Sequence, residues 1–267
     1  YLGNDIDVLN KILINKHPLS KDLKNSVFPM IIIGDEVFSH QQSNSIQSTC
    51  IKILERFDGF RKDWNGYNIL HNTSSIVGSI DIIKKFSDHS HQKIYHQSKK
   101  GEIKLLYLLG VDEIDYDYED TFVIYQGHHG DLGAQKANVI LPGSAYTEKS
   151  AIFINLEGRL QMSERAVFPP GEAKDDWTII RALSEEIGKK IDFDKIEEVR
   201  EKMFDEVPII NSFSQKKYNL KPKVKKFKKI YSSKLENNKK NFYMTCPISR
   251  CSETMAECIK SNQGKFE

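Results

Sequence analysis

The residues best suited to chemistry lie between Tyr125 and Gln161, in the stretch YQGHHGDLGAQKANVILPGSAYTEKSAIFINLEGRLQ. Its adjacent His128 and His129 could bind a metal or transfer protons, since histidine titrates near neutral pH. Asp131 could orient one ring through a hydrogen bond. Adjacent strand residues point to opposite faces, so both rings could reach one metal only from a bent loop. We favour a strand-end loop in which one ring packs and the other bonds to the backbone.

Glycines at three-residue intervals, Gly127, Gly130 and Gly133, belong to the same stretch. Ligands of open α/β sheets bind where strands end, so a phosphate cradle is one interpretation. The spacing GxxGxxG differs, however, from the dinucleotide-binding pattern GxGxxG. We favour tight turns as the role of these glycines.

Charged residues after Pro142 form a second candidate group, namely Glu148, Glu157, Arg159 and Glu164. Two carboxylates could act as a general acid and a general base. No nucleophile with a paired base is visible in the sequence. A structural salt-bridge network is therefore the preferred interpretation.

The four cysteines, Cys50, Cys246, Cys251 and Cys258, form no CxxC pair. The last three are separated by steps of five and seven residues, whereas zinc and iron–sulfur sites use tighter spacings. We expect free thiols in a reducing compartment, with a metal cluster as the alternative.

Apolar runs separated by helical patterns predict the elements that position these residues. A buried parallel strand is predicted from Val27 to Gly34. Apolar residues then recur at helical spacing, namely Ile46, Cys50, Ile53, Leu54 and Phe57. Further strands are predicted over 67–72, 103–110, 121–126 and 137–141, with a helix over 76–83. Strands that alternate with helices predict an α/β fold with right-handed crossovers.

The pattern changes beyond Pro142, where a hairpin is predicted over 152–161. A helix follows from Asp175 to a stop at Gly188, and further helices are predicted over 193–204 and after Ser252. We therefore divide the chain into an α/β domain over 1–170 and a helical C-terminal section over 171–267.

Charge is distributed unevenly along the 267 residues. Eleven lysines and one glutamate give the segment 215–240 a charge of +10, so the remainder of a chain with total charge +2 carries −8. We expect the segment to be either a solvated surface loop or a binding region for an acidic neighbouring subunit or anionic lipid. Nucleic acid is disfavoured as a partner, because Phe227 and Tyr231 alone make a poor stacking platform for bases. Apolar Val224, Phe227, Ile230 and Leu235 predict that part of it packs down.

Membrane attachment is expected to be peripheral, since no apolar run approaches the roughly 20 residues of a transmembrane helix. The chain begins at Tyr1 with neither a secretory signal nor an Arg-rich leader, and we expect a processed or split protein.

The stretch from Tyr125 to Gln161 strongly resembles part of the large iron–sulfur subunit of respiratory complex I. Other segments resemble the same family in the same order: PMIIIGDEVF, WNGYNILHNTSSIVGSIDI, LLYLLGVDE, GEAKDDWTIIRALSEEIG and the C-terminal FYMTCPISRCSETMAECI. The lysine-rich segment 215–240 is the part least similar to the family.

In that family, an N-terminal half carries iron–sulfur clusters, and a C-terminal half resembles molybdopterin oxidoreductases of the formate dehydrogenase type. The C-terminal half holds no molybdopterin and catalyses nothing. The chain resembles only this half. The resemblance implies a parallel Rossmann-like sheet with helices on both faces and a smaller helical C-terminal section.

The resemblance also implies that the site is a remnant. Its residues would be Gly127, His128, His129, Asp131, Glu148 and Arg159. No catalytic residue, cofactor or metal is then expected in this chain, and iron–sulfur clusters are expected in the missing N-terminal half, whether that half is a separate polypeptide or another part of the same protein.

The function implied is structural support of the peripheral NADH-oxidising arm of complex I, which passes electrons from NADH to ubiquinone. Its partners would be other subunits of that arm, including the iron–sulfur half, and no nucleic acid. It would reach the membrane only through the complex, on the matrix side of the mitochondrial inner membrane or at the bacterial cytoplasmic membrane. The alternatives are an active molybdopterin-dependent oxidoreductase domain and a stand-alone nucleotide-binding module.

Overall fold

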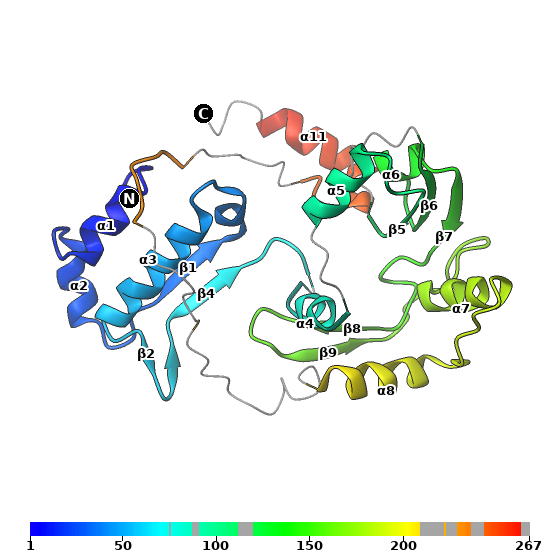
Figure 1. Ribbon diagram of the computed structural model, residues 1–267, viewed down its shortest axis with the longest axis horizontal. Coiled ribbons are helices and arrows are strands. Elements are labelled where there is room, and N and C mark those ends of the chain that lie inside the picture. Colours follow the sequence, from blue (N-terminus) through cyan, green and yellow to red (C-terminus); the bar gives the residue numbers. More distant parts are fainter. Residues whose placement is uncertain are drawn as a thin grey trace. The chain divides into compact units, whose positions relative to one another are not determined.

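The computed structural model describes residues 1–74, 76–86, 91–111, 120–208, 222, 229–235 and 243–262 (Figure 1). It divides into two compact units. The first holds Tyr1–Val77, Ile154–Arg159 and the described part of 212–239, and the second holds Gly78–Phe153 and the described parts of 160–211 and 240–267. The division at residue 170 stays a prediction.

The first unit is built on a pair of parallel strands joined by a long helix. Its elements are α1 (Asp7–Leu13), α2 (Leu19–Asn25), β1 (Ile31–Gly34), the 3-10 helix η1 (Asp35–Ser39), α3 (Ser43–Arg56), β2 (Phe60–Arg61), β3 (Trp64–Asn65) and β4 (Tyr67–Leu70). Strand β1 pairs in parallel with β4, and β2 pairs antiparallel with β3. The apolar spacing predicted for α3 is confirmed, because Ile46, Cys50 and Ile53 are all buried.

Residues 229–235, here called the returning segment, complete the core of this unit. Ile230 is only 1% exposed and packs with Ile6 and Ile33. The backbone N of Leu235 donates to Asn4 O at 2.7 Å, and the backbone N of Ile6 donates to Ser233 O at 3.1 Å. The predicted packing of Ile230 is confirmed. Apart from Pro222 and residues 229–235, the lysine-rich segment 215–240 lies outside the described residues.

The second unit contains a three-stranded parallel sheet in the order β5–β6–β7. Its elements are α4 (Ile76–Phe86), α5 (His91–Lys99), β5 (Leu105–Leu109), β6 (Phe122–Gly127), α6 (Leu132–Gln135), β7 (Val139–Pro142), β8 (Ala151–Ile154), β9 (Leu160–Ser163), α7 (Asp176–Glu186), α8 (Ile196–Glu206), α10 (Pro247–Arg250) and α11 (Glu253–Asn262). Strands β8 and β9 form the predicted hairpin.

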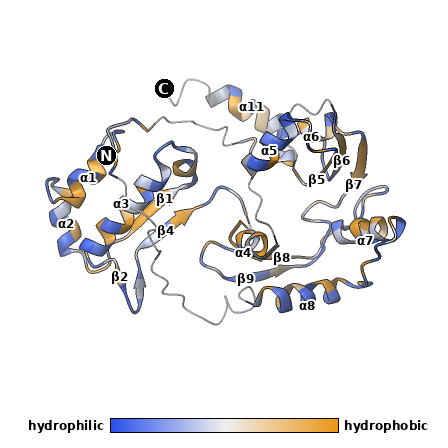
Figure 2. Ribbon diagram, viewed as in Figure 1, coloured by the Kyte–Doolittle hydropathy of each residue, from blue (hydrophilic) through white to orange (hydrophobic). Residues whose placement is uncertain are grey.

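The register of the three strands separates the two faces of this sheet. Leu108 pairs with Tyr125, and both are buried on the face that packs against Ala134 of α6. On the other face, Leu105 and Phe122 are a pair and are 58% and 47% exposed. The predicted mixed α/β fold with parallel strands is confirmed, in the form of small parallel sheets whose strands are largely hydrophobic, as β1, β4 and β7 show in Figure 2.

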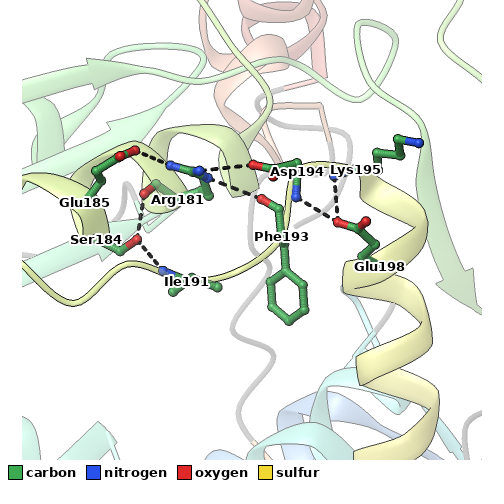
Figure 3. Close-up of polar contacts among 8 residues, drawn as sticks. All are labelled: Arg181, Ser184, Glu185, Ile191, Phe193, Asp194, Lys195 and Glu198. Atoms are coloured by element: carbon green, nitrogen blue, oxygen red, sulfur yellow. Dashed lines mark hydrogen bonds and ion pairs between the residues drawn. The ribbon is translucent and has the colours of Figure 1, made fainter.

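An arginine of α7 holds the link between α7 and α8 (Figure 3). Arg181 Nη2 donates to Asp194 Oδ1 at 3.0 Å, Nε donates to Phe193 O at 3.3 Å, and Nη1 donates to the Glu185 carboxylate. The hydrogen bonds that Arg181 donates to Glu185 and Asp194 raise the pKa of Arg181. The predicted helix stop is confirmed, because Gly188 has a φ of 69°, in the left-handed region that glycine favours.

The described residues contain no helix that is both long enough and apolar enough to span a membrane.

Candidate functional site at the ends of the parallel strands

The predicted histidine loop follows directly from the end of β6. The Nδ1 atoms of His128 and His129 are 2.8 Å apart, so one ring donates and the other accepts. Tyr125 Oη donates to the backbone O of His129 at 2.8 Å. The rings therefore bond to each other, and His129 is also held through its carbonyl. That one ring packs while the other bonds to the backbone stays a prediction.

Asp131 has a structural role in this loop. Its Oδ1 accepts from the backbone N of Leu132 at 2.8 Å and so caps α6. Its Oδ2 lies 2.5 Å from Arg250 Nε, and both side chains are about four-fifths covered, at 19% and 22% exposure. The carboxylate therefore ties α10 to the loop instead of orienting a histidine.

The glycines of the loop differ in how much space a side chain would have at each position. A Cβ at Gly127 would lie 2.5 Å from Tyr125 Oη, so the close approach of that tyrosine demands glycine. A Cβ at Gly130 would meet only Ala134, at 3.9 Å. The following helix α6 has four residues, which is too short to cradle a phosphate at its N-terminus.

The remaining predicted site residues are not brought together. Glu148 Oε2 accepts from the backbone N of Ala145 at 2.9 Å, and Glu164 accepts from Ser150 Oγ at 3.2 Å. Arg159 is exposed in the turn between β8 and β9 and belongs to the first unit. Within the part of the chain that the structure describes, no ion pair joins Glu148, Glu157, Arg159 and Glu164, so the predicted salt-bridge network is wrong.

A different polar cluster lies at the carboxyl ends of β5 and β6. We call Tyr107, Gln126, Lys149 and Asp176 the strand-end cluster. Gln126 is fully buried, and its Nε2 donates to Asp176 Oδ1 at 2.9 Å. Tyr107 Oη donates to Gln126 Oε1, and Lys149 Nζ lies 2.5 Å from Asp176 Oδ2. Each member of this cluster therefore has a partner within it.

Asp176 reaches the strand ends because the residues before α7 are tied to β7. The backbone N of Lys174 donates to Pro142 O at 3.2 Å, and the backbone N of Ser144 donates to Lys174 O at 2.9 Å. A Cβ at Gly143 would lie 2.8 Å from Asp176 Oδ1, so the chain passes close to the carboxylate. The N-terminus of α7 thus faces the carboxyl ends of β6 and β7.

The electrostatics of the cluster keep the proton of Tyr107 in place. Burial raises the pKa of Tyr107, and the negative charge of Asp176 raises it further. Tyr107 consequently remains a hydrogen-bond donor, and Gln126 Oε1 is its acceptor. Ser144 is 1% exposed, and its Oγ has no partner among the residues described.

The cysteines lie elsewhere, and none of the four forms a disulfide. Burial raises the pKa of Cys50 to about 12, so this thiol is unreactive at neutral pH. Cys246 is exposed, and hydrogen bonds with Ser249 lower its thiol pKa. The described ranges contain no group of three or more His, Cys, Asp or Glu residues that could hold a metal ion.

The sequence matches two known family models. The family model described as molybdopterin oxidoreductase matches residues 1–186. The chain belongs to the molybdopterin oxidoreductase family. A second model, which describes the C-terminal region of the G subunit of NADH-ubiquinone oxidoreductase, matches residues 210–258.

Curated members of this kind are similar over nearly the whole chain. The G subunit of NADH-quinone oxidoreductase from Rickettsia bellii is 38% identical over 98% of this chain and 37% of its own length. The NADH-ubiquinone oxidoreductase 75 kDa subunit of Reclinomonas americana is 41% identical over 96% of this chain and 38% of its own. The mitochondrial 78 kDa subunit of Candida albicans is 39% identical over the full chain and 37% of its own.

These matches confirm the predicted resemblance. The chain spans less than two fifths of the length of the curated relatives it matches. A molybdopterin cofactor, which the family implies, carries phosphate and needs donors at the strand ends. Here the Asp176 carboxylate, paired with Lys149, occupies the N-terminus of α7, so the strand-end cluster does not fit a phosphate-bearing group.

The strand-end cluster was not predicted from the sequence. One signal pointed to it, since Gln126 is a polar residue inside the apolar run TFVIYQ. A buried amide must find hydrogen-bond partners, so its position indicated a polar network.

Proposed function

We propose that this chain is a non-catalytic structural part of the large subunit of respiratory complex I, within its peripheral NADH-oxidising arm. The observation that supports a structural role is the strand-end cluster. At the edge where open α/β sheets bind ligands, the chain places its own ion pair of Lys149 and Asp176. The similarity to subunits of NADH-quinone oxidoreductase supports the proposal that the chain belongs to this complex.

In this proposal the chain shapes and supports the arm while electrons pass from NADH to ubiquinone through iron–sulfur clusters held elsewhere. The small parallel sheets would be parts of a Rossmann-like, formate dehydrogenase-like layer with helices on both faces. The partners would be the iron–sulfur half of the same subunit and other peripheral-arm subunits. The chain would lie on the matrix side of the mitochondrial inner membrane, or at the bacterial cytoplasmic membrane.

The proposal is tested by following the chain through a native gel of gently solubilised membranes. We expect it to migrate with a large assembly that oxidises NADH. Recovery of the chain only as a free soluble monomer would refute the proposal.

The rival function, an active molybdopterin-dependent oxidoreductase, is separated by metal analysis of the same purified assembly. Molybdenum or tungsten in a one-to-one ratio with this chain would support that enzyme and would contradict a structural role.

A further inference from the structure

We propose that the Asp176 carboxylate is an internal replacement for a bound anion, and that Lys149 is its counter-ion. The inference rests on the proposed structural function and deepens it, because it names what fills the strand ends. An anion site would lie here if the carboxylate were absent.

The groups around Asp176 are those that bind a phosphate. Asp176 is the first residue of α7, an 11-residue helix whose N-terminus favours negative charge. The Lys149 ammonium and the Gln126 amide both contact the carboxylate, at 2.5 and 2.9 Å. A cation, an amide donor and a helix N-terminus therefore converge on one negative group.

Tyr107 fixes the direction in which the Gln126 amide points. Because Tyr107 Oη donates to Oε1, Nε2 must face Asp176 and act as a donor. This tyrosine is a positioning residue, since it does not itself contact the carboxylate. The donor stays in place when the carboxylate is removed, provided that Tyr107 is intact.

The backbone beside the cluster also suits a close-fitting anion. Gly143 leaves room for Asp176 Oδ1, because a Cβ there would lie only 2.8 Å from it. The next residue, Ser144, has a buried hydroxyl for which the described residues provide no partner. Truncation of Asp176 would leave space lined by the Lys149 ammonium and the Gln126 amide instead of an apolar void.

An ordinary structural ion pair makes a different prediction. If Asp176 and Lys149 only stabilise the fold, truncation of Asp176 lowers stability and creates no binding site. If the carboxylate replaces an anion, truncation creates a site that inorganic pyrophosphate or phosphate can occupy.

The experiment measures binding of radiolabelled inorganic pyrophosphate to the intact assembly that carries Asp176→Ala. We expect at least one additional saturable site per copy, with an affinity at least tenfold higher than any binding that the native protein shows in the same range. Lys149→Gln in the Asp176→Ala background should remove most of the gain. Phosphate should compete.

The matched control is Asp131→Ala, which truncates another carboxylate paired with a basic side chain but located beside a four-residue helix. It should gain no site. Equal binding by the native protein and Asp176→Ala would overturn the inference, as would a folded Asp176→Ala that binds nothing new.

If Asp176→Ala fails to assemble, Asp176→Ser also removes the carboxylate and empties most of its space, and it should still bind pyrophosphate more tightly than the native protein. An assembled Asp176→Ser without this gain would overturn the inference. Co-migration with the NADH-oxidising assembly is measured separately, so the inference and the proposed function can fail independently.

Discussion

The two parallel sheets of the chain are stabilised in different ways. In the first unit, β1 buries Ile33 against Ile46 of α3 and Ile230 of the returning segment, and the cluster is apolar throughout. In the second unit, Gln126 of β6 is fully buried and belongs to a polar network with Tyr107 and Asp176.

The connections between the strands explain the difference. The 14-residue helix α3 lies between β1 and β4 in the chain and supplies its own apolar stripe. Between β6 and β7 there is only the four-residue α6, so the strand ends are met by α7, which comes later in the chain. Burial of polar groups costs free energy unless each is hydrogen-bonded, so the second sheet requires a complete network.

The largest effect is expected from truncation in the apolar core of the first unit. Ile53→Ala removes a side chain that is 1% exposed and should cost about 2–5 kcal/mol of unfolding free energy. Denaturant unfolding can be followed by Trp64 in the first unit and by Trp177 in the second, since these are the two tryptophans of the chain. The control Ile14→Ala, at a 52% exposed position, should have little effect. An equal response of both tryptophans to Ile53→Ala would show that the two units unfold together.

A smaller effect is expected from breaking the polar network. Gln126→Leu leaves Tyr107 Oη without its acceptor and Asp176 without one of its donors, and it should cost about 1–3 kcal/mol. Addition of Tyr107→Phe should restore part of this loss, because it removes one of the orphaned groups. A strictly additive double variant would show that the two side chains act independently.

An alkaline loss of stability should be centred on the first unit. Burial raises the pKa of Cys50 from 9.0 to about 12 and that of Tyr67 from 10.0 to about 12, with the Cys50 charge as a second cause for Tyr67. Above pH 9 the unfolded chain releases these protons while the folded chain keeps them, so stability is full below pH 9 and falls as pH rises towards 12.

Each such proton contributes a slope of about 1.4 kcal/mol per pH unit. Cys50→Ala should therefore flatten the alkaline unfolding profile reported by Trp64. The exposed Cys251→Ala is the matched control and should leave the profile unchanged. Identical profiles for Cys50→Ala and the native chain would contradict the assignment.

The smallest effect is expected at the histidine pair, which lies outside the strand-end cluster. His128→Gln alters an exposed side chain and should change stability by no more than about 0.5 kcal/mol. NADH oxidation per assembled complex should stay unchanged, and His129→Gln should behave alike. A large loss of turnover at normal assembly would indicate chemistry at these rings.

The strands could be predicted because each one corresponds to a continuous apolar run of the sequence. The run that ends at Gly34 shortens to β1, since Val27 and Phe28 are exposed and Pro29 uses its carbonyl to accept from Trp64 Nε1. Helices α7 and α8 were likewise visible from their apolar stripes and from the stop at Gly188.

The polar contacts could not be predicted in this way. Gln126 and Asp176 are 50 residues apart, and each is an ordinary residue where it stands. The conspicuous pair His128 and His129 attracted attention through residue type, and its rings bond to each other. Local patterns predict elements, whereas the partners of buried polar groups depend on how distant segments meet.

The returning segment has a consequence for synthesis on the ribosome. Asn10 Nδ2 donates to the carbonyl of Ile230, 220 residues further along the chain, and Ile230 is part of the core around Ile6. Chains emerge N-terminus first, and contacts between distant residues form slowly. The first unit therefore cannot complete its core until residue 230 has emerged, and until then its Ile6 side offers nascent-chain chaperones an open apolar seam.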